Sequence, residues 1–118
     1  MAKILIVDDS RTSRKILKEL LEGGGHEVVG EASNGEEGLL LYRELRPEAV
    51  TMDITMPTMN GLESLRCIKK EDGNAKVIMI TAAGQKEKML QAIKEGADDF
   101  ITKPFGAEQI LGAIERVL

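Results

Sequence analysis

The chain alternates five times between a short apolar run and a stretch with helical periodicity, and this order limits the folds that it can adopt. Ile4–Val7 and Val77–Ile80 are uninterrupted apolar runs, which is typical of strands buried on both faces of a parallel sheet. Weaker strand patterns cover Val28–Ala32, Ala49–Asp53 and Asp99–Thr102. Right-handed crossovers between such strands predict an α/β fold, an open, doubly wound parallel sheet of five strands with five helices.

The segments between and after these runs carry apolar residues at helical spacing. Ser10 is a residue type that caps helices, so the first helix should begin after it and end at the glycines 23–25. Pro47 and Gly96 mark the expected ends of the second and fourth helices. The expected apolar faces comprise Ile16, Leu17, Leu20 and Leu21; Leu41, Tyr42 and Leu45; Leu62, Leu65 and Ile68; Met89, Leu90 and Ile93; and Ile110, Leu111, Ile114, Val117 and Leu118.

Length and composition favour one globular domain, and we expect residues 1–118 to form it without a linker to a second one. The net charge of −4, from 16 basic and 20 acidic side chains, argues against nucleic acid as a partner. No segment approaches the ~20 apolar residues of a membrane helix, so a location in the cytoplasm is expected. The single cysteine, Cys67, allows no internal disulfide and should be half-buried, and the only histidine, His26, should lie on the plain surface.

Residues able to do chemistry follow four of the five predicted strands. Asp8 and Asp9 follow the first strand, Asp53 ends the third, Thr81 follows the fourth and Lys103 follows the fifth. Taken singly, an Asp after a strand is often a turn former, and a lysine before a proline is usually an ordinary loop residue. In open α/β sheets, however, ligands bind beyond the carboxyl ends of the strands, where the winding direction reverses. The position of all five residues at this one edge therefore predicts a site.

Three carboxylates that meet at one edge repel one another unless a proton or a cation compensates their charge. If the first and third strands are neighbours, Asp8, Asp9 and Asp53 form such a cluster, and Mg²⁺ suits a site with few carboxylates and several waters. A Mg²⁺ ion beside a nucleophilic Asp indicates phosphoryl transfer that yields an aspartyl phosphate. Lys103 and Thr81 would then contact the phosphoryl oxygens, and the small Ala82 would leave room for the donor.

Four segments, in this order and at this spacing, resemble the receiver domain of bacterial two-component response regulators, and the resemblance covers the full length of the chain. The segments are Ile4–Ser10, Met52–Pro57 with Asn60-Gly61, Ile80–Ala82 and Phe100–Phe105. The resemblance implies a flavodoxin-like (CheY-like) sheet with the strand order 2-1-3-4-5. It also implies a signalling protein and not a turnover enzyme, although such domains promote their own phosphorylation and dephosphorylation.

Site roles follow from the resemblance one residue at a time. Asp53 matches the phosphoacceptor, Asp9 matches the acid that binds Mg²⁺ directly, and Asp8 matches the acid that acts mainly through water. Asp53 also ligates the metal, and Thr55 contributes its backbone carbonyl.

Thr81 and Lys103 match the hydroxyl and the amine that contact the phosphoryl group, and the Lys103–Pro104 peptide bond is cis in the family. The implied mechanism is a two-state switch. Thr81 moves toward the phosphoryl group, and Phe100, a position that is often Tyr in the family, turns into the vacated space. The surface formed by the fourth helix, the fifth strand and the fifth helix then changes its affinity for a partner.

Thr55 and Ala83, two residues after the phosphoacceptor and two after Thr81, carry no charge or amide that could orient an attacking water. We therefore expect slow self-dephosphorylation, with a separate phosphatase or a partner tuning the lifetime. The segments Val50–Pro57 and Thr81–Gln85 resemble chemotaxis regulators of the CheY type. This resemblance implies a chemotaxis histidine kinase as phosphoryl donor, the flagellar motor switch as target, and a monomer.

Three other interpretations stay open at this point. The chain could be a phosphorelay intermediate or a stand-alone receiver of another pathway. A flavodoxin-like electron carrier shares the fold, but Asp8–Arg11 is not a Ser/Thr/Gly-rich phosphate loop, and two Phe and one Tyr are few aromatics to flank a flavin. A phosphatase of the haloacid dehalogenase kind needs an Asp-x-Asp motif, which Asp53-Ile54-Thr55 lacks.

Overall fold

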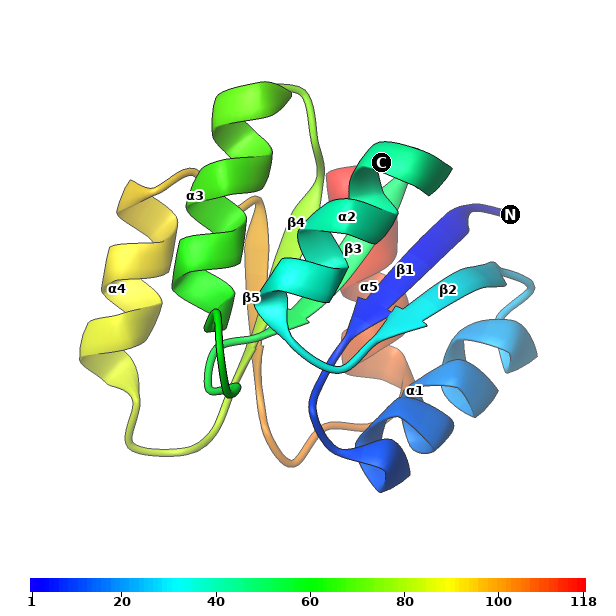
Figure 1. Cartoon of the computed structure of the whole chain (residues 1–118). Helices are drawn as coiled ribbons and strands as arrows, with labels where there is room; N and C mark the ends of the chain where they lie inside the picture. Colours follow the sequence, from blue (N-terminus) through cyan, green and yellow to red (C-terminus); the bar gives the residue numbers. More distant parts are fainter.

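A computed structural model describes residues 1–118 and confirms the predicted parallel sheet with helices on both faces (Figure 1). The elements are β1 (Lys3–Val7), α1 (Arg11–Gly23), β2 (Glu27–Ala32), α2 (Gly35–Leu45), β3 (Ala49–Asp53), α3 (Gly61–Glu71), β4 (Val77–Thr81), α4 (Lys86–Lys94), β5 (Asp99–Thr102) and α5 (Ala107–Val117). Helices α1 and α5 lie on one face of the sheet, and α2, α3 and α4 cover the other. No helix is long and apolar enough to cross a membrane.

The strand order β2-β1-β3-β4-β5 makes β1 and β3 neighbours, as the resemblance implied. All four strand pairs are parallel, with Val7 beside Met52 and Asp53 beside Ile80. From β1 the chain proceeds to one edge of the sheet at β2 and then returns to build the other side from β3 outward. The winding direction therefore reverses between β1 and β3, and the carboxyl ends of both strands open at the same edge.

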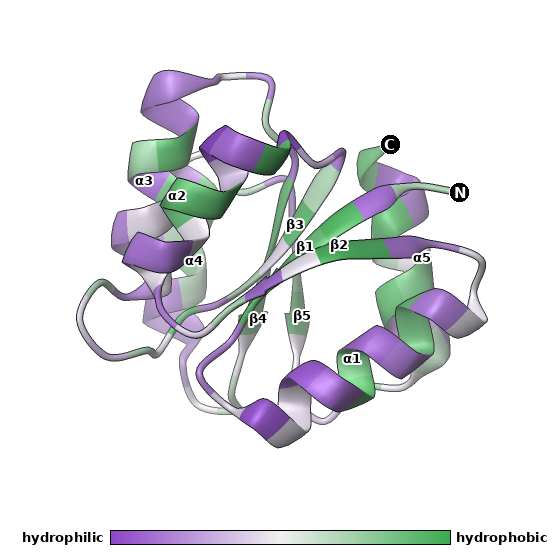
Figure 2. Ribbon diagram, turned by 45° about the vertical axis from the view of Figure 1, so that its right-hand side comes forward, coloured by the Kyte–Doolittle hydropathy of each residue, from purple (hydrophilic) through white to green (hydrophobic).

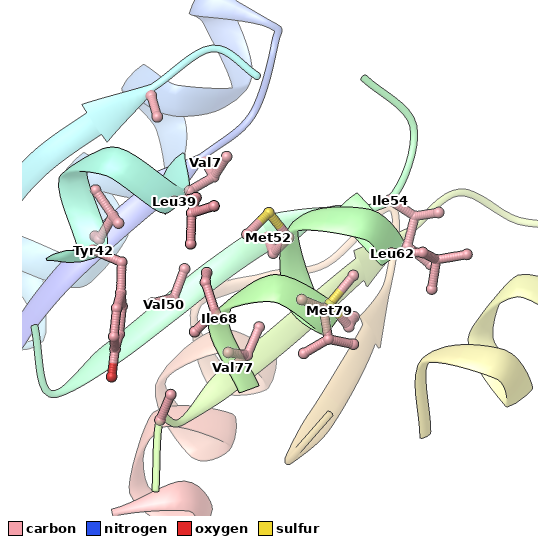
Figure 3. Close-up of a cluster of buried hydrophobic side chains, with 14 of the residues drawn as sticks. Val7, Leu39, Tyr42, Val50, Met52, Ile54, Leu62, Ile68, Val77 and Met79 are labelled. Atoms are coloured by element: carbon pink, nitrogen blue, oxygen red, sulfur yellow. The ribbon is translucent and has the colours of Figure 1, made fainter. Parts of the chain in front are cut away.

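Side chains of the central strands alternate between two separate cores. On β1, Leu5 and Val7 face the α2–α3–α4 layer, whereas Ile4 and Ile6 face the α1–α5 layer. Figure 3 shows the first core, where Val50 and Met52 of β3 lie near side chains of α2, α3 and β4, and Figure 2 shows how the hydrophobic colour gathers on the strands. Burial on both faces explains why these strands are uninterrupted apolar runs.

One buried hydroxyl interrupts the second core. Thr51 lies between Ile6 and Ile78 in the sheet, is fully buried, and its Oγ1 has no hydrogen-bond partner. Because a buried hydroxyl without a partner is costly, Thr51 lowers the stability of the fold.

The loop between β3 and α3 folds back onto the end of β3. A backbone hydrogen bond and a capping box at the start of α3 hold it in place. The Gly61 N–H donates to the Ile54 carbonyl at 2.8 Å, and a Cβ at position 61 would lie 2.0 Å from the Asp53 carbonyl oxygen. Asn60 and Glu63 form a reciprocal capping box at the start of α3. A residue without a side chain is therefore required where α3 begins, directly behind Asp53.

Helix boundaries agree with the expected signals. The Ser10 side chain accepts a hydrogen bond from the Ser13 N–H at 3.2 Å, and α1 ends at Gly23. Cys67 is half-buried on α3, as predicted, and packs against the first core.

Two expectations about burial were wrong. His26 is not plain surface: it is half-buried, and its Nδ1 accepts a hydrogen bond from the Ala2 N–H at 3.1 Å. Four residues assigned to apolar helix faces are about half exposed, namely Ile16 at 51%, Leu90 at 51%, Ile93 at 46% and Leu118 at 58%. Periodicity shows which residues share one side of a helix, but a neighbouring element must be present to cover them.

Candidate functional site

Three carboxylates converge where β1 and β3 end. Oxygen atoms of Asp8, Asp9 and Asp53 lie within 4.8 Å of one another. Asp8 and Asp53 are buried, at 1% and 8% exposed, whereas Asp9 is open to solvent. The two buried acids come from adjacent strands, so the sheet itself sets their separation.

Asp8 has one satisfied and one free carboxylate oxygen. Its Oδ1 accepts a hydrogen bond from the Ser10 N–H at 2.8 Å, while its Oδ2 is buried without a hydrogen-bond partner. A buried anionic oxygen in this state is costly, and it points to a ligand, such as a cation or a cation-bound water, that completes the site.

Lys103 brings the only ammonium group within ion-pairing distance of the cluster. Its Nζ lies 3.7 Å from Asp8 Oδ2 and 3.6 Å from Asp53 Oδ2. Both distances exceed those of a normal hydrogen bond, so the lysine attracts both acids without being tied to either one. Lys103 precedes Pro104, and the peptide bond between them is cis.

The environment raises the pKa of Asp53 from 3.8 to about 6. Burial is the largest cause, since it penalises the charged carboxylate. The attraction of Lys103 opposes this effect, the charges of Asp8 and Asp9 add to it, and a backbone hydrogen bond from Thr55 lowers the pKa again. Without a cation, burial and the neighbouring charges therefore make the ionised form of Asp53 less favourable than that of an exposed aspartate.

Of the other predicted residues, Thr81 and Thr55 border the same edge, whereas Phe100 lies within β5 beside Met79 of β4. Thr81 ends β4 and is 1% exposed, and its Oγ1 has no hydrogen-bond partner. Thr55 lies exposed in the loop after β3. Phe100 lies on β5 and is 38% exposed, so it is not packed into the interior. The structure thus brings Asp8, Asp9, Asp53 and Lys103 together, with an unsatisfied hydroxyl on the adjacent strand.

Gln85 is a neighbour of the site to which the sequence assigned no role. Its Nε2 donates to Thr55 Oγ1 at 2.8 Å, and its Oε1 accepts from the Ala82 N–H at 2.9 Å. The hydrogen bond therefore joins Thr55, two residues after Asp53, to Gln85, four residues after Thr81. Only the tertiary structure brings this amide to the site, because Gln85 and Thr55 are 30 residues apart.

A hollow of about 390 Å³ opens beside the cluster, between α1 and the loops that follow β4 and β5. Asp8 and Lys103 contribute charged groups to its lining, and Ile16, Pro104 and Phe105 form part of its apolar wall. The exposure of Ile16 is explained by its place in this wall.

Comparison with known proteins identifies the fold and the class. A family model described as "response regulator receiver domain" matches residues 4–115. The chain belongs to the response regulator receiver family. The chemotaxis protein CheY of Thermotoga maritima is 48% identical over 98% of this chain and 96% of its own length. Protein CcdB of Bacillus subtilis is 47% identical over 100% of this chain and 98% of its own length.

A solved CheX–CheY complex with BeF₃ and Mg²⁺ from Borrelia burgdorferi matches with a TM-score of 0.93 at 36% identity, covering 98% of this chain and 87% of that one. Receiver domains are signalling proteins that bind Mg²⁺ in an acidic pocket. In this receiver domain, the cluster of Asp8, Asp9 and Asp53 fits such an ion, since it offers oxygen ligands only and one of them is buried without a partner.

Proposed function

We propose that this receiver domain is a phosphorylation-activated switch and that Asp53 accepts the phosphoryl group. The observation that carries the proposal is the position of Asp53, which combines two acidic neighbours with an ammonium group 3.6 Å from its Oδ2. The acids suit a cation, and the ammonium suits an anion, so the site fits a phosphoryl group bound together with a metal ion. A sensor histidine kinase is the donor class that this receiver domain would use.

Asp9, Asp8 and Asp53 would hold Mg²⁺, Asp9 directly and Asp8 mainly through water, with the Thr55 backbone carbonyl as a further ligand. When bound, Mg²⁺ neutralises charge on the phosphoryl oxygens. An Asp53 carboxylate oxygen attacks the phosphorus of the donor, and the bond from phosphorus to the donor nitrogen or oxygen breaks as the leaving group takes the electron pair. Asp53 must be ionised for this attack, so a bound cation that lowers its pKa also favours the reaction.

Lys103 and Thr81 would bind the added oxygens. The Lys103 ammonium already faces both buried acids at 3.6–3.7 Å, and the Thr81 hydroxyl has no other partner. A phosphoryl group would supply charged acceptors to both donors, which is the strongest kind of hydrogen bond at such a site. A shift of Thr81 toward these oxygens would open space for Phe100, which is 38% exposed in this state.

The output surface would be formed by α4, β5 and α5. Leu90 and Ile93 on α4 and Phe100 on β5 are large apolar side chains exposed to solvent. Exposed apolar residues of this kind suit a protein partner more than they suit water. The flagellar motor switch is the target we propose, in a chemotaxis pathway in the cytoplasm, and the CheY relatives support this choice.

A stand-alone receiver of another pathway, or a phosphorelay intermediate, is the second candidate. It is supported by CcdB, which is 47% identical, against 48% for the Thermotoga maritima CheY, and does not carry a chemotaxis name. The two candidate functions would be separated by comparing how the phosphorylated protein binds a motor-switch protein with how it binds histidine-containing relay proteins.

The test of the acceptor is incubation with Mg²⁺ and acetyl phosphate, followed by intact mass. We expect one phosphate adduct on the protein, no adduct on Asp53→Asn, and an adduct on the control Asp98→Asn, which changes an acid outside the cluster. An unchanged mass for the native protein, or an adduct that persists in Asp53→Asn, would contradict the proposal. Slow loss of the adduct is also expected, and Ala83→Glu should shorten its lifetime because a carboxylate there can orient water.

A further inference from the structure

The Gln85 carboxamide joins the two loops that border the mouth of the site. Its Nε2 donates to Thr55 Oγ1 in the loop between β3 and α3, and its Oε1 accepts from the Ala82 N–H in the loop between β4 and α4. The Gln85 N–H also donates to the Ala82 carbonyl at 3.4 Å, so Ala82 and Gln85 close a tight turn in both directions. The turn contains Gly84 at φ +90°, a conformation that suits glycine.

This use of the side chain has a cost at the start of α4. Gln85 is the N-cap residue of α4, but its side chain makes no capping hydrogen bond to that helix. Glutamine is a weak capping residue in any case, and here its amide is committed to Thr55 and Ala82 instead. The residue that begins α4 is therefore bonded to the mouth of the site, while the first turn of α4 has no side-chain cap.

We propose that Gln85 is a positioning residue that acts as a latch: its amide holds the two loops together in the unphosphorylated protein and releases Ala82 when Asp53 is phosphorylated. This inference rests on the proposed function of Asp53. The Ala82 N–H is the backbone donor next to Thr81, whose free hydroxyl is one of the groups expected to bind the phosphoryl oxygens. The phosphoryl group thus brings anionic acceptors toward a donor that a neutral amide oxygen now occupies.

The competition favours the phosphoryl group once it is present. A hydrogen bond to an anionic oxygen is roughly twice as strong as one to a neutral carbonyl. The latch therefore opposes phosphorylation by a modest free energy and does not prevent it. Because Gln85 begins α4, its release also frees the first turn of the helix whose Leu90 and Ile93 belong to the proposed output surface.

The direction of the effect separates a latch from simple structural damage. Gln85→Met keeps the length of the side chain but removes both hydrogen bonds, so it should destabilise only the unphosphorylated conformation. We expect the affinity for beryllofluoride, a phosphoryl mimic, in the presence of Mg²⁺ to increase about threefold to tenfold, as expected for the loss of about one net hydrogen bond. Damage to the site would weaken beryllofluoride binding instead.

The matched control is Gln91→Met, because Gln91 is a glutamine on the exposed side of the same helix. Its beryllofluoride affinity should equal that of the native protein. Thr55→Val removes the other end of the latch and should also increase the affinity, and the double variant Gln85→Met/Thr55→Val should add little to either single change. Full additivity of the two changes would contradict a shared latch.

A second measurement needs neither metal nor phosphoryl group. Amide hydrogen exchange at Ala82 in the metal-free protein should become faster in Gln85→Met and stay unchanged in Gln91→Met. Unchanged exchange in Gln85→Met, or equal or weaker beryllofluoride binding by that variant, would overturn the inference. If instead the native protein forms no adduct on Asp53, the proposed function fails, and the exchange rates still report on the contact itself.

Discussion

Replacement of Asp53 by Asn should stabilise the metal-free protein at neutral pH. Burial and the charges of Asp8 and Asp9 outweigh the attraction of Lys103, so the pKa of Asp53 is raised from 3.8 to about 6. The folded state then binds its proton more tightly than the unfolded state does, and ionisation costs stability as the pH rises through this range. At 1.36 kcal/mol for each pH unit between the two values, the cost reaches about 3 kcal/mol by pH 7.

Asn has the shape of the protonated acid and carries no charge, so Asp53→Asn should recover most of this free energy. We expect urea unfolding in EDTA to show the variant about 2–3 kcal/mol more stable than the native protein at pH 7. The difference should shrink toward zero at pH 4, where Asp53 is protonated in the folded state. Saturating Mg²⁺ should stabilise the native protein, by about 2.7 kcal/mol at 100 times its dissociation constant, and should stabilise the variant less.

The control is Glu19→Gln, which removes one acidic charge at an exposed position of α1. Both variants change the net charge from −4 to −3, so a general charge effect would stabilise them equally. We expect Glu19→Gln to stay within about 0.5 kcal/mol of the native protein. The reasoning is refuted if Asp53→Asn is no more stable at pH 7, or if its advantage is the same at pH 4.

Three further changes test the neighbours of Asp53. Gly61→Ala should destabilise the fold by about 3 kcal/mol in urea unfolding, because its Cβ would meet the Asp53 carbonyl oxygen. Thr51→Val should raise the free energy of unfolding by about 1 kcal/mol, since it removes a buried hydroxyl without a partner; a loss of stability would contradict this. Lys103→Met should raise the Asp53 pKa further above about 6, measured by NMR titration of the carboxyl group without metal, and a lower pKa would show that Lys103 does not favour the ionised form.

Features of the site that suit a ligand lower the stability of the free protein. The Asp8 Oδ2 and Thr81 Oγ1 atoms are both buried without hydrogen-bond partners, and the Asp53 charge is disfavoured. Each of these features lowers the stability of the free protein, and in the function that we propose each would be relieved by a cation or by a phosphoryl group. A site of this kind favours its bound states because its free state is incompletely satisfied.

Much of the fold followed from local pattern. The apolar runs at β1 and β4 are buried on both sides of a parallel sheet, and their ends at Asp8 and Thr81 agree with the strand ends in the structure. Ser10 caps the start of α1, and the helix ends at the glycines 23–25, as the chemistry of these residues requires. These features depend on each residue and its close neighbours in the chain, so the sequence determined them by itself.

Local pattern did not determine which elements lie side by side in the fold. Periodicity could not show that β1 lies beside β3, which the family resemblance supplied, and this adjacency is what brings Asp8 and Asp53 together. The exposure of Leu90 and the half-burial of His26 were also decided by the elements that do or do not pack against them. Burial depends on contacts between distant segments, and helical spacing contains no information about those contacts.

At the edge of the sheet, the amino-acid sequence determined which residues would be available, since Asp53 and Thr81 end recognisable strands and Lys103 follows one. The tertiary structure alone decided what these residues face. It places Lys103 near both Asp8 and Asp53 and leaves the Thr81 hydroxyl without a partner. It also brings Gln85 into hydrogen-bonding contact with Thr55, 30 residues away in the chain. The physical reason is that charge, burial and hydrogen bonding act through space, whereas motifs record only the order of residues along the chain.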